Sequence, residues 1–444
     1  MYTSREATPG STVYFWFPSG VDTSQPVVPP GWNIRCPSDY TIGNWHWQWA
    51  WKVTIPLTAA PGTYNIGDKE IVVRNNIVTT RPRKTQLIQP GLSLFDAQNA
   101  VNIGRDLILK PGLHVWKGSL NVLNNTKISG YHATILRMPN GEYAERMFIP
   151  KGTMFLEGLT LTHECDWPTY IHNYLDPPTS TLSGQITVKN CTLKGGELIR
   201  CFQSRNMLVQ NCRFEKASTG QVPSLSVWDH CDFVGHTANG MHAFFNTGAE
   251  GILVTNCTWY GTNRGIVFQT GSCRGSMIMN CYFDNIRGGE ANANEVILFE
   301  GNGVPGEGIR ENTLVDINIT NCAGPGICLF GSGFTDNRFW SINAEVDNTA
   351  LMIAAINGQI DNNSFENFQT TGGIDLRGPI GKVKFGNLQI YERPQMSGNQ
   401  GPFTPILEHF NQNYPLHKDN VTGEITFYGS NFWRSNRTKE PING

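Results

Sequence analysis

The sequence predicts an all-β protein whose main part is a right-handed, single-stranded parallel β-helix of about 10 to 12 coils. Three observations predict this fold. A short motif, apolar–x–Asn–Cys–x–aromatic, recurs along the chain. Its copies lie about 25 residues apart, a spacing that fits a coil of three short strands. The 444 residues also include 47 glycines, as expected for β-structure with many tight corners.

A separate region precedes the repeats. Residues 1–85 are rich in proline and aromatic residues, and Trp45, Trp47, Trp49 and Trp51 alternate strictly. Alternation predicts a strand with four tryptophans on one face. That face is either the core of a small β domain or a docking surface for a partner or for sister chains. We expect an N-terminal β-rich attachment or oligomerisation domain that ends in a linker.

The β-helix is expected over residues 86–395. Residues 94–101 resemble a short amphipathic helix at its start, and residues 107–115 resemble its first rung. The Asn-Cys motif follows, at Asn190–Cys191, Asn211–Cys212, Asn256–Cys257 and Asn280–Cys281, with His230–Cys231 as a variant. Apolar residues two apart face the core, the asparagine tolerates the left-handed backbone of a sharp bend, and the cysteine points inward again. Stacked asparagine amides are expected to hydrogen-bond from coil to coil.

Weaker copies extend the series of bends in both directions. The predicted bends are Gly130, Gly158, Asn190, Asn211, His230, Asn256, Asn280, Glu311, Asp336, Asn362 and Asn387. Asn321 lies too close to Asp336 for a full coil and is assigned to another strand. Residues 396–444 lack the repeat and are expected to form a C-terminal cap, because an exposed last rung would be an open strand edge.

Composition excludes several classes of partner. Lys and Arg number 34 against 36 Asp and Glu, so no basic excess favours nucleic acid. No apolar run reaches the roughly 20 residues of a membrane span, and the first residues show no signal peptide. The 11 cysteines show no CxxC pair and no zinc-like spacing. We therefore expect buried free thiols, a chain made in a reducing cytoplasm, and neither a metal nor a cofactor.

This organisation resembles the pectate-lyase-like superfamily of right-handed parallel β-helices, most of all phage tailspike proteins, over roughly residues 86–395. The resemblance implies a rigid scaffold that carries lyases, hydrolases or inert spikes, so the reaction has to be inferred from a site.

Two long intervals between bends predict loops at residues 163–184 and 284–305. The candidate catalytic residues are the loop carboxylates Glu164, Asp166, Glu295 and Glu300, because glycoside hydrolysis needs two carboxyl groups about 5 to 9.5 Å apart and elimination needs a base. Trp167 and Tyr170 are candidates for stacking on sugars. The alternative is that these groups are solvated loop charge.

A second candidate surface is the outer face of the strand between consecutive motifs. Its second and fourth positions are predicted to point outward, which selects His242, Phe244, Asp375 and Arg377 as further substrate-binding residues. The middle of this face is apolar. It is covered either by loops or by sister chains in a homotrimer, or it forms a sugar-stacking groove.

Three functions stay open. The first is a tailspike-like virion protein, assembled in the bacterial cytoplasm, that docks to a phage tail or baseplate protein through its N-terminal domain and binds host surface polysaccharide, with or without cleaving it. The second is a polysaccharide lyase or glycoside hydrolase of cellular origin. The third is a non-enzymatic structural or adhesive spike. The first is favoured.

Overall fold

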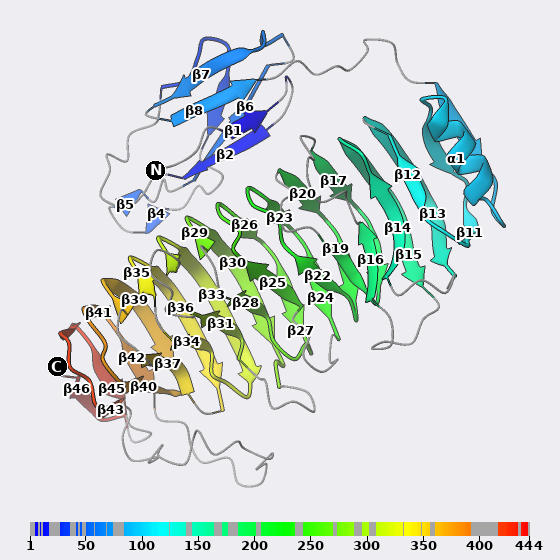
Figure 1. Cartoon of the computed structure of the whole chain (residues 1–444). Coiled ribbons are helices and arrows are strands. Elements are labelled where there is room, and N and C mark those ends of the chain that lie inside the picture. The colour runs from blue at the N-terminus through cyan, green and yellow to red at the C-terminus, as the bar shows by residue number, and fades with distance from the viewer. Residues whose placement is uncertain are drawn as a thin grey trace. The chain divides into compact units, whose positions relative to one another are not determined.

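A computed structural model of the chain divides into two compact units, Met1–Pro82 and Arg83–Gly444 (Figure 1). The structure describes residues 5–7, 9, 12–16, 27–35, 41–42, 45–46, 50–56, 58–67, 69–73, 84–123, 125–138, 144–163, 171–175, 185–200, 206–235, 243–269, 273–287, 295–301, 308–331, 333–347, 349–355, 360–391, 416–433 and 437–442. Within these ranges no helix is long and apolar enough to span a bilayer.

The N-terminal unit is a small β domain with its own apolar core of Val53, Ile55, Ile66, Ile71 and Val73. Its strands are β1 (Arg5–Ala7), β2 (Thr12–Trp16), β3 (Asn33–Arg35), β4 (Thr41–Ile42), β5 (Trp45–His46), β6 (Ala50–Thr54), β7 (Gly62–Ile66) and β8 (Lys69–Val73). The prediction of one strand carrying all four tryptophans is wrong. Trp45 lies in β5, which pairs with β4, whereas Trp51 lies in β6, which pairs with β2 and β3; Trp47 and Trp49 lie outside the described residues.

The second unit is the predicted right-handed parallel β-helix (Figure 1). Helix α1 (Leu94–Asn102) lies near its start and buries Ala97, Ala100 and Val101. Each coil then contributes strands to three faces. The third face is a sheet of 12 parallel strands, which agrees with the predicted number of coils.

The first two faces are joined at a corner, and several long strands run through it. Their strands are β9 (Thr85–Ile88), β10 (Asp106–Leu109), β11 (Gly112–Trp116), β13 (Thr126–Arg137), β15 (Met154–His163), β17 (Ile186–Lys189), β18 (Thr192–Lys194), β20 (Met207–Gln210), β21 (Arg213–Glu215), β23 (Val227–Asp229), β24 (Asp232–Val234), β26 (Leu253–Thr255), β27 (Thr258–Tyr260), β30 (Met277–Asp284), β33 (Thr313–Cys322), β36 (Arg338–Val346), β39 (Asn363–Thr370), β41 (Val383–Gly386), β42 (Gln389–Tyr391), β44 (Ile425–Tyr428), β45 (Asn431–Trp433) and β46 (Lys439–Pro441).

The third face, called here the 12-stranded sheet, carries the candidate site. Its strands are β12 (Leu120–Val122), β14 (Ala144–Pro150), β16 (Ile171–Leu175), β19 (Glu197–Arg200), β22 (Ser218–Gln221), β25 (Phe244–Thr247), β28 (Ile266–Gln269), β31 (Ile297–Glu300), β34 (Ile327–Gly331), β37 (Thr349–Ala355), β40 (Gly373–Arg377) and β43 (Leu416–Asp419). A short fourth sheet joins β29 (Cys273–Arg274), β32 (Ile309–Arg310), β35 (Phe334–Thr335) and β38 (Ile360–Asp361). The predicted loop at 163–184 contains β16, so part of it is an ordinary rung.

The corner between the first two faces, called here the first corner, confirms the Asn-Cys motif. Gly158, Asn190, Asn211, His230, Asn256, Asn280 and Asn387 all have positive φ. In the coil of β13 the positive φ falls on His132 instead of the predicted Gly130. The reason is an irregularity in which three residues, Gly130 to His132, lie opposite the single Gly158.

The later bends were predicted at the right residues but at the wrong corner of the coil. Glu311, Asp336 and Asn362 have positive φ, yet they follow the strands of the fourth sheet and form a second corner. The first corner of the same coils is made by Asp316, Ser341 and Asn367. Both corners need a left-handed residue, so both select the same residue types.

The core is filled by the cysteine column and by stacked aromatic rings. Cys191, Cys212, Cys231, Cys257 and Cys281 are buried and lie one above the other after the first corner. Their alignment is the arrangement that the motif predicts. Phe339, Phe365, Phe385 and Phe427 continue the core as a stack with ring centroids 4.4 to 5.1 Å apart.

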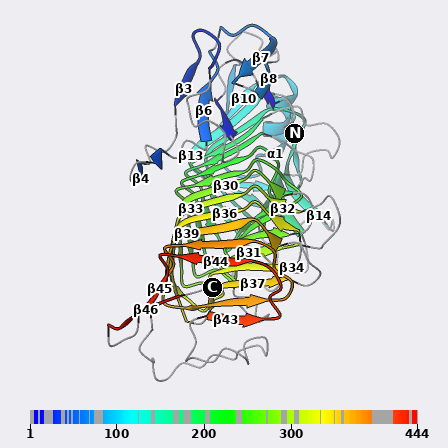
Figure 2. The same ribbon diagram turned by 90° about the vertical axis from the view of Figure 1, so that its left-hand side faces the viewer.

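The β-helix continues beyond the predicted limit of residue 395. Strands β43, β44 and β45 pair in parallel with β40, β41 and β42, and therefore build a further coil instead of a separate cap. Strand β46 then pairs antiparallel with β45. Figure 2 views the stack from this C-terminal end, with β43 to β46 in front.

Candidate functional site

The outer side of the 12-stranded sheet holds two rows of side chains. Strand register places Gln269, Glu300, Phe330, Ala354 and Arg377 in one line across five consecutive coils, called here the outer row. Beside it run Val267, Leu298, Cys328, Met352 and Asp375, called here the apolar column although it ends in an aspartate. Neighbouring members of each row are about 4.8 Å apart along the stack.

The apolar column is already covered within a single chain. Val267, Leu298, Cys328 and Met352 form a buried cluster of their own, with at most 7% of any residue exposed. Burial raises the pKa of the Cys328 thiol well above its usual value, with nearby Glu295 adding to the effect. The sequence left two explanations for the apolar middle of this face: it is covered, or it forms a sugar-stacking groove. Because these four residues are buried, only the first explanation fits them.

The outer row is accessible and chemically mixed. The amide of Gln269 donates a 2.8 Å hydrogen bond to Glu300 Oε2, which fixes the carboxylate against the preceding coil. On the next coil, Phe330 exposes 37% of its surface. The small Ala354 follows and leaves room between the phenyl ring and Arg377. The row therefore offers a hydrogen-bond acceptor, an aromatic surface and a cation in sequence.

A buried ion pair sets the orientation of the guanidinium at the end of the row. Arg377 Nη2 and Nε lie 2.6 and 3.0 Å from the two carboxylate oxygens of Asp375. The Asp375 side chain is buried, whereas Arg377 keeps 23% of its side chain exposed. The bidentate geometry makes the guanidinium a preorganised donor at the surface. Asp375 thus positions Arg377, and only the arginine faces solvent.

Glu295 lies two residues before strand β31, whereas Glu300 is the last residue of that strand. Glu295 Oε2 accepts a 2.7 Å hydrogen bond from Arg264 Nε on the preceding coil, and both side chains are half-buried. Glu300 is likewise directed to the preceding coil, toward Gln269. The two glutamates are separated by five residues of nearly extended chain, roughly 16 Å. Because neither leans toward the other, they lie too far apart for a hydrolytic pair.

Glu300 and Asp375 do not form such a pair either. They belong to adjacent rows and are three coils apart, a separation of roughly 14 Å along the stack. Asp375 is also occupied by Arg377. Both hydrolytic geometries require shorter separations. The described carboxylates of this face therefore suit recognition of a ligand better than acid–base cleavage.

The predicted site residues have different outcomes. Glu300, Asp375 and Arg377 lie on this outer face and Glu295 lies just before strand β31; the roles of all four stay predictions. Five others lie outside the described residues, namely Glu164, Asp166, Trp167, Tyr170 and His242.

The prediction that Phe244 binds substrate is wrong. This side chain is fully buried and packs edge-on against Trp228 and Trp259 in the core, so it cannot contact a substrate. Strand register pairs Phe244 with Ile266, which is also a core residue. A one-residue slip of register exchanges the inner and outer faces of a strand.

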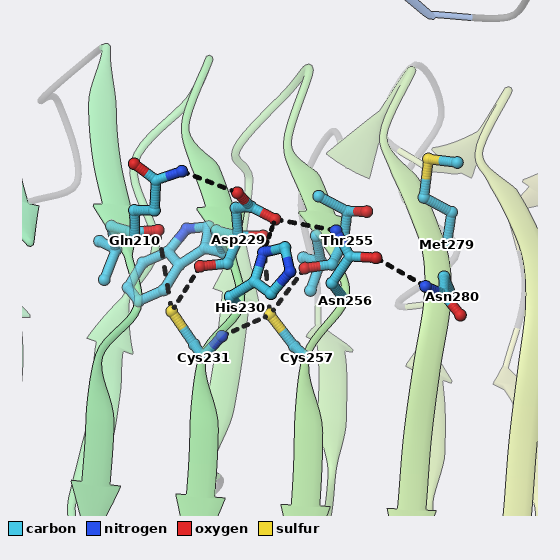
Figure 3. A network of polar contacts seen from close by, with 12 residues as sticks. Gln210, Asp229, His230, Cys231, Thr255, Asn256, Cys257, Met279 and Asn280 are labelled. Atoms are coloured by element: carbon cyan, nitrogen blue, oxygen red, sulfur yellow. Dashed lines mark hydrogen bonds and ion pairs between the residues drawn. The ribbon is translucent and has the colours of Figure 1, made fainter. Parts of the chain in front are cut away.

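A second polar cluster lies at the first corner (Figure 3). Asp229 accepts hydrogen bonds from Gln210 at 2.9 Å and Asn256 at 2.9 Å, and its Oδ1 lies 2.6 Å from His230 Nδ1. Asn280 then donates to Asn256 at 2.6 Å. This ladder links four successive coils, which agrees with the predicted structural role of His230 as a turn residue. Within the described ranges no three His, Cys, Asp or Glu side chains gather as metal ligands.

The sequence pattern predicts that Gln269, Phe330 and Ala354 point outward, but it does not single them out as a site. Strands β28 and β34 show no alternation of polarity, because Ile266 to Phe268 and Ile327 to Phe330 are apolar throughout, so the outward positions follow only from alignment with the repeat. What the sequence does not reveal is that Glu300, and not Phe299, occupies the same row.

Comparisons with known proteins give only distant similarities. No protein-family model matches the sequence, and no curated protein matches it. Among solved structures, the A-module of the mannuronan C-5 epimerase AlgE4 from Azotobacter vinelandii is 13% identical, with a TM-score of 0.48, over 77% of this chain and 95% of that chain. The Streptococcus pneumoniae surface adhesin PfbA is 14% identical, with a TM-score of 0.37, over 75% and 94% of the two chains. A family 28 exopolygalacturonase from Yersinia enterocolitica is 11% identical, with a TM-score of 0.31, over 94% and 97%.

Proposed function

We propose that this chain is a glycan-binding β-helix spike of the tailspike type, and that it holds a polysaccharide along the outer row. The observation that carries the proposal is the order of Glu300, Phe330 and Arg377 on successive coils, with Ala354 as a gap. A sugar ring needs an apolar surface for its C–H face and polar groups for its hydroxyls. The row supplies both on a rigid element, where little ordering is needed on binding.

The proposal includes a virion context. It is supported by the free, buried cysteines, which fit assembly in a reducing bacterial cytoplasm, and by an N-terminal unit with a core of its own, which suits attachment to a tail or baseplate protein. The homotrimer stays a prediction. Its argument from an exposed apolar strip is weakened, because the described strip is covered within one chain.

Cleavage of the polysaccharide is left outside the proposal. The described carboxylates of the sheet lie too far apart for hydrolysis, and each is held by an amide or a guanidinium. The cellular lyase or hydrolase is therefore the weaker alternative. An adhesive spike without activity is compatible with the same row.

The test is affinity electrophoresis in native gels cast with alginate, polygalacturonate, hyaluronan or dextran. We expect at least one of these polymers to retard the wild-type protein. Phe330→Ala should weaken that retardation about fivefold to tenfold, since one aromatic contact contributes about 1 kcal/mol. Tyr282→Ala, which removes an exposed ring from another face, is the matched control and should not change it. Retardation by none of the polymers, or equal retardation of the Phe330→Ala variant, would refute the proposal.

A further inference from the structure

A cavity lies in the C-terminal coil, on a different face of the β-helix from the outer row. It has a volume of about 580 Å³ and opens where β46 folds back along β45. That volume lies within the range of small-molecule sites. Its wall includes Gln369, Tyr391, Asn431 and Lys439, all from the second face or from β46. The 12-stranded sheet contributes none of the described lining residues.

The polar wall is built around a fixed glutamine. Gln389 is buried; its Oε1 accepts a 2.7 Å hydrogen bond from Trp433 Nε1, and its Nε2 donates to Asn387 Oδ1 at 2.9 Å. Next to it, Gln369 is exposed and makes no side-chain hydrogen bond within the described part of the chain. A locked amide beside an unengaged one is a suitable arrangement for binding hydroxyl groups.

Aromatic rings and one cation complete the cavity. Tyr391 is partly exposed and stacks on Trp433, with ring centroids 6.2 Å apart and planes 12° from parallel. Lys439 Nζ lies 5.4 Å from the centroid of the Trp433 ring, which holds the cation at the rim. None of the described lining residues is acidic. The cavity therefore combines amides, an aromatic edge and an uncompensated positive charge.

From this chemistry we infer that the terminal cavity is a second saccharide site, which takes a short acidic oligosaccharide and pairs a uronate carboxylate with Lys439. It is independent of the outer row, because its described lining residues come from the other faces of the β-helix and from β46, and none comes from the 12-stranded sheet. Two separated sites for one polymer would raise its overall affinity by multivalency.

The experiment is titration calorimetry of the Phe330→Ala protein, in which the outer row is disabled, with trigalacturonate and trimannuronate. At least one trisaccharide should bind, and adding Lys439→Gln should weaken binding about tenfold, because a hydrogen bond to a charged group contributes roughly 1.5 kcal/mol. Lys418→Gln is the matched control. Lys418 also lies over a ring of the last coil, 5.5 Å from the centroid of Phe427, but does not line the cavity.

A second readout keeps the test independent of folding. The indole N–H resonance of Trp433, assigned with Trp433→Phe, should shift on addition of the trisaccharide, because its hydrogen bond to Gln389 forms the wall. Binding that Lys439→Gln leaves unchanged, binding weakened equally by Lys418→Gln, or no binding of either trisaccharide would overturn the inference. The proposed function is tested separately, by the effect of Phe330→Ala on retardation by whole polymers.

Discussion

Inside the core, Asn337 Nδ2 donates a 3.0 Å hydrogen bond to Asn363 Oδ1 on the next coil. Asn337 Oδ1 in turn accepts from Asn312 Nδ2 at 3.0 Å, so three buried amides form a ladder after the second corner. A similar pair, Asn256 and Asn280, lies at the surface of the first corner. Both ladders are built from asparagine side chains, but one is buried in the core and the other lies at the surface.

Asn337→Ala should therefore destabilise the protein more than Asn256→Ala. The buried change removes the acceptor of the Asn312 backbone N–H, one of the two acceptors of Asn312 Nδ2, and the side-chain donor to the Ile309 carbonyl, at a cost of about 3 kcal/mol. The surface change removes two hydrogen bonds of the outer corner, to Asp229 and from Asn280, and places alanine at a positive φ, at a cost of about 1 to 2 kcal/mol. Urea denaturation followed by circular dichroism measures both. Equal losses would contradict this account of the inner ladder.

The cysteine column predicts a loss of stability in alkali. Burial raises the pKa of Cys281 to about 12 in the folded protein, whereas an exposed thiol titrates near 8.5. Between these values the unfolded chain has lost the proton that the folded chain keeps, so the free energy of unfolding falls as pH rises. Cys281→Ala should reduce this slope between pH 9 and pH 11 by about 1.4 kcal/mol per pH unit at most. Denaturation of both proteins at pH 8, 9.5 and 11 measures it, and identical slopes would count against a buried thiol.

The two arginine–carboxylate pairs at the 12-stranded sheet should contribute differently to the stability of the protein. Asp375→Ala removes the buried partner of Arg377 and should cost about 3 kcal/mol. Arg264→Ala breaks a pair in which both side chains, including Glu295, keep 20% exposed, and it should cost about 1 kcal/mol or less because water still reaches the carboxylate. Urea midpoints of the two variants decide this. A larger loss for Arg264→Ala would show that Asp375 is not the positioning residue of the outer row.

Two phenylalanines of the 12-stranded sheet, Phe244 on β25 and Phe330 on β34, should separate stability from binding. Phe244→Ala opens a cavity among Trp228 and Trp259 and should cost about 3 to 5 kcal/mol. Phe330→Ala should lower stability by about 1 kcal/mol or less, because the ring is partly exposed, and should affect polysaccharide retention instead. Thermal denaturation and gel retardation are measured on both proteins. A stable Phe244→Ala variant that loses retention would reverse the assignment of inner and outer faces.

The sequence predicts this fold well wherever a residue type has one structural meaning. At Asn190, Asn211, Asn256 and Asn280, a residue that tolerates positive φ is followed by a small inward thiol, and both properties repeat. The later series failed because Glu311 and Asp336 satisfy the same backbone requirement at a different corner. Residue type alone does not distinguish two bends of equal geometry.

The candidate site was only partly predictable for a related reason. When the strands are aligned by the motif spacing, the fourth residue of Ile327 to Phe330 is predicted to point outward. For this strand the prediction is correct, because Phe330 lies on the outer side of the sheet. In Val296 to Phe299 all four residues are apolar, so alternation gives no phase; the rule that the second and fourth positions point outward selects Phe299, which is in fact buried against Phe268. Pairing across the coils fixes the phase of such strands, and Glu300 joins the row only through that pairing.

The most direct test of the outer row is a crystal structure of the protein with an oligosaccharide cut from whichever polymer retards it. The account predicts a sugar ring on Phe330, with hydroxyl or carboxylate groups bonded to Glu300 and Arg377. An empty outer row in crystals where the same oligosaccharide occupies another surface would contradict it.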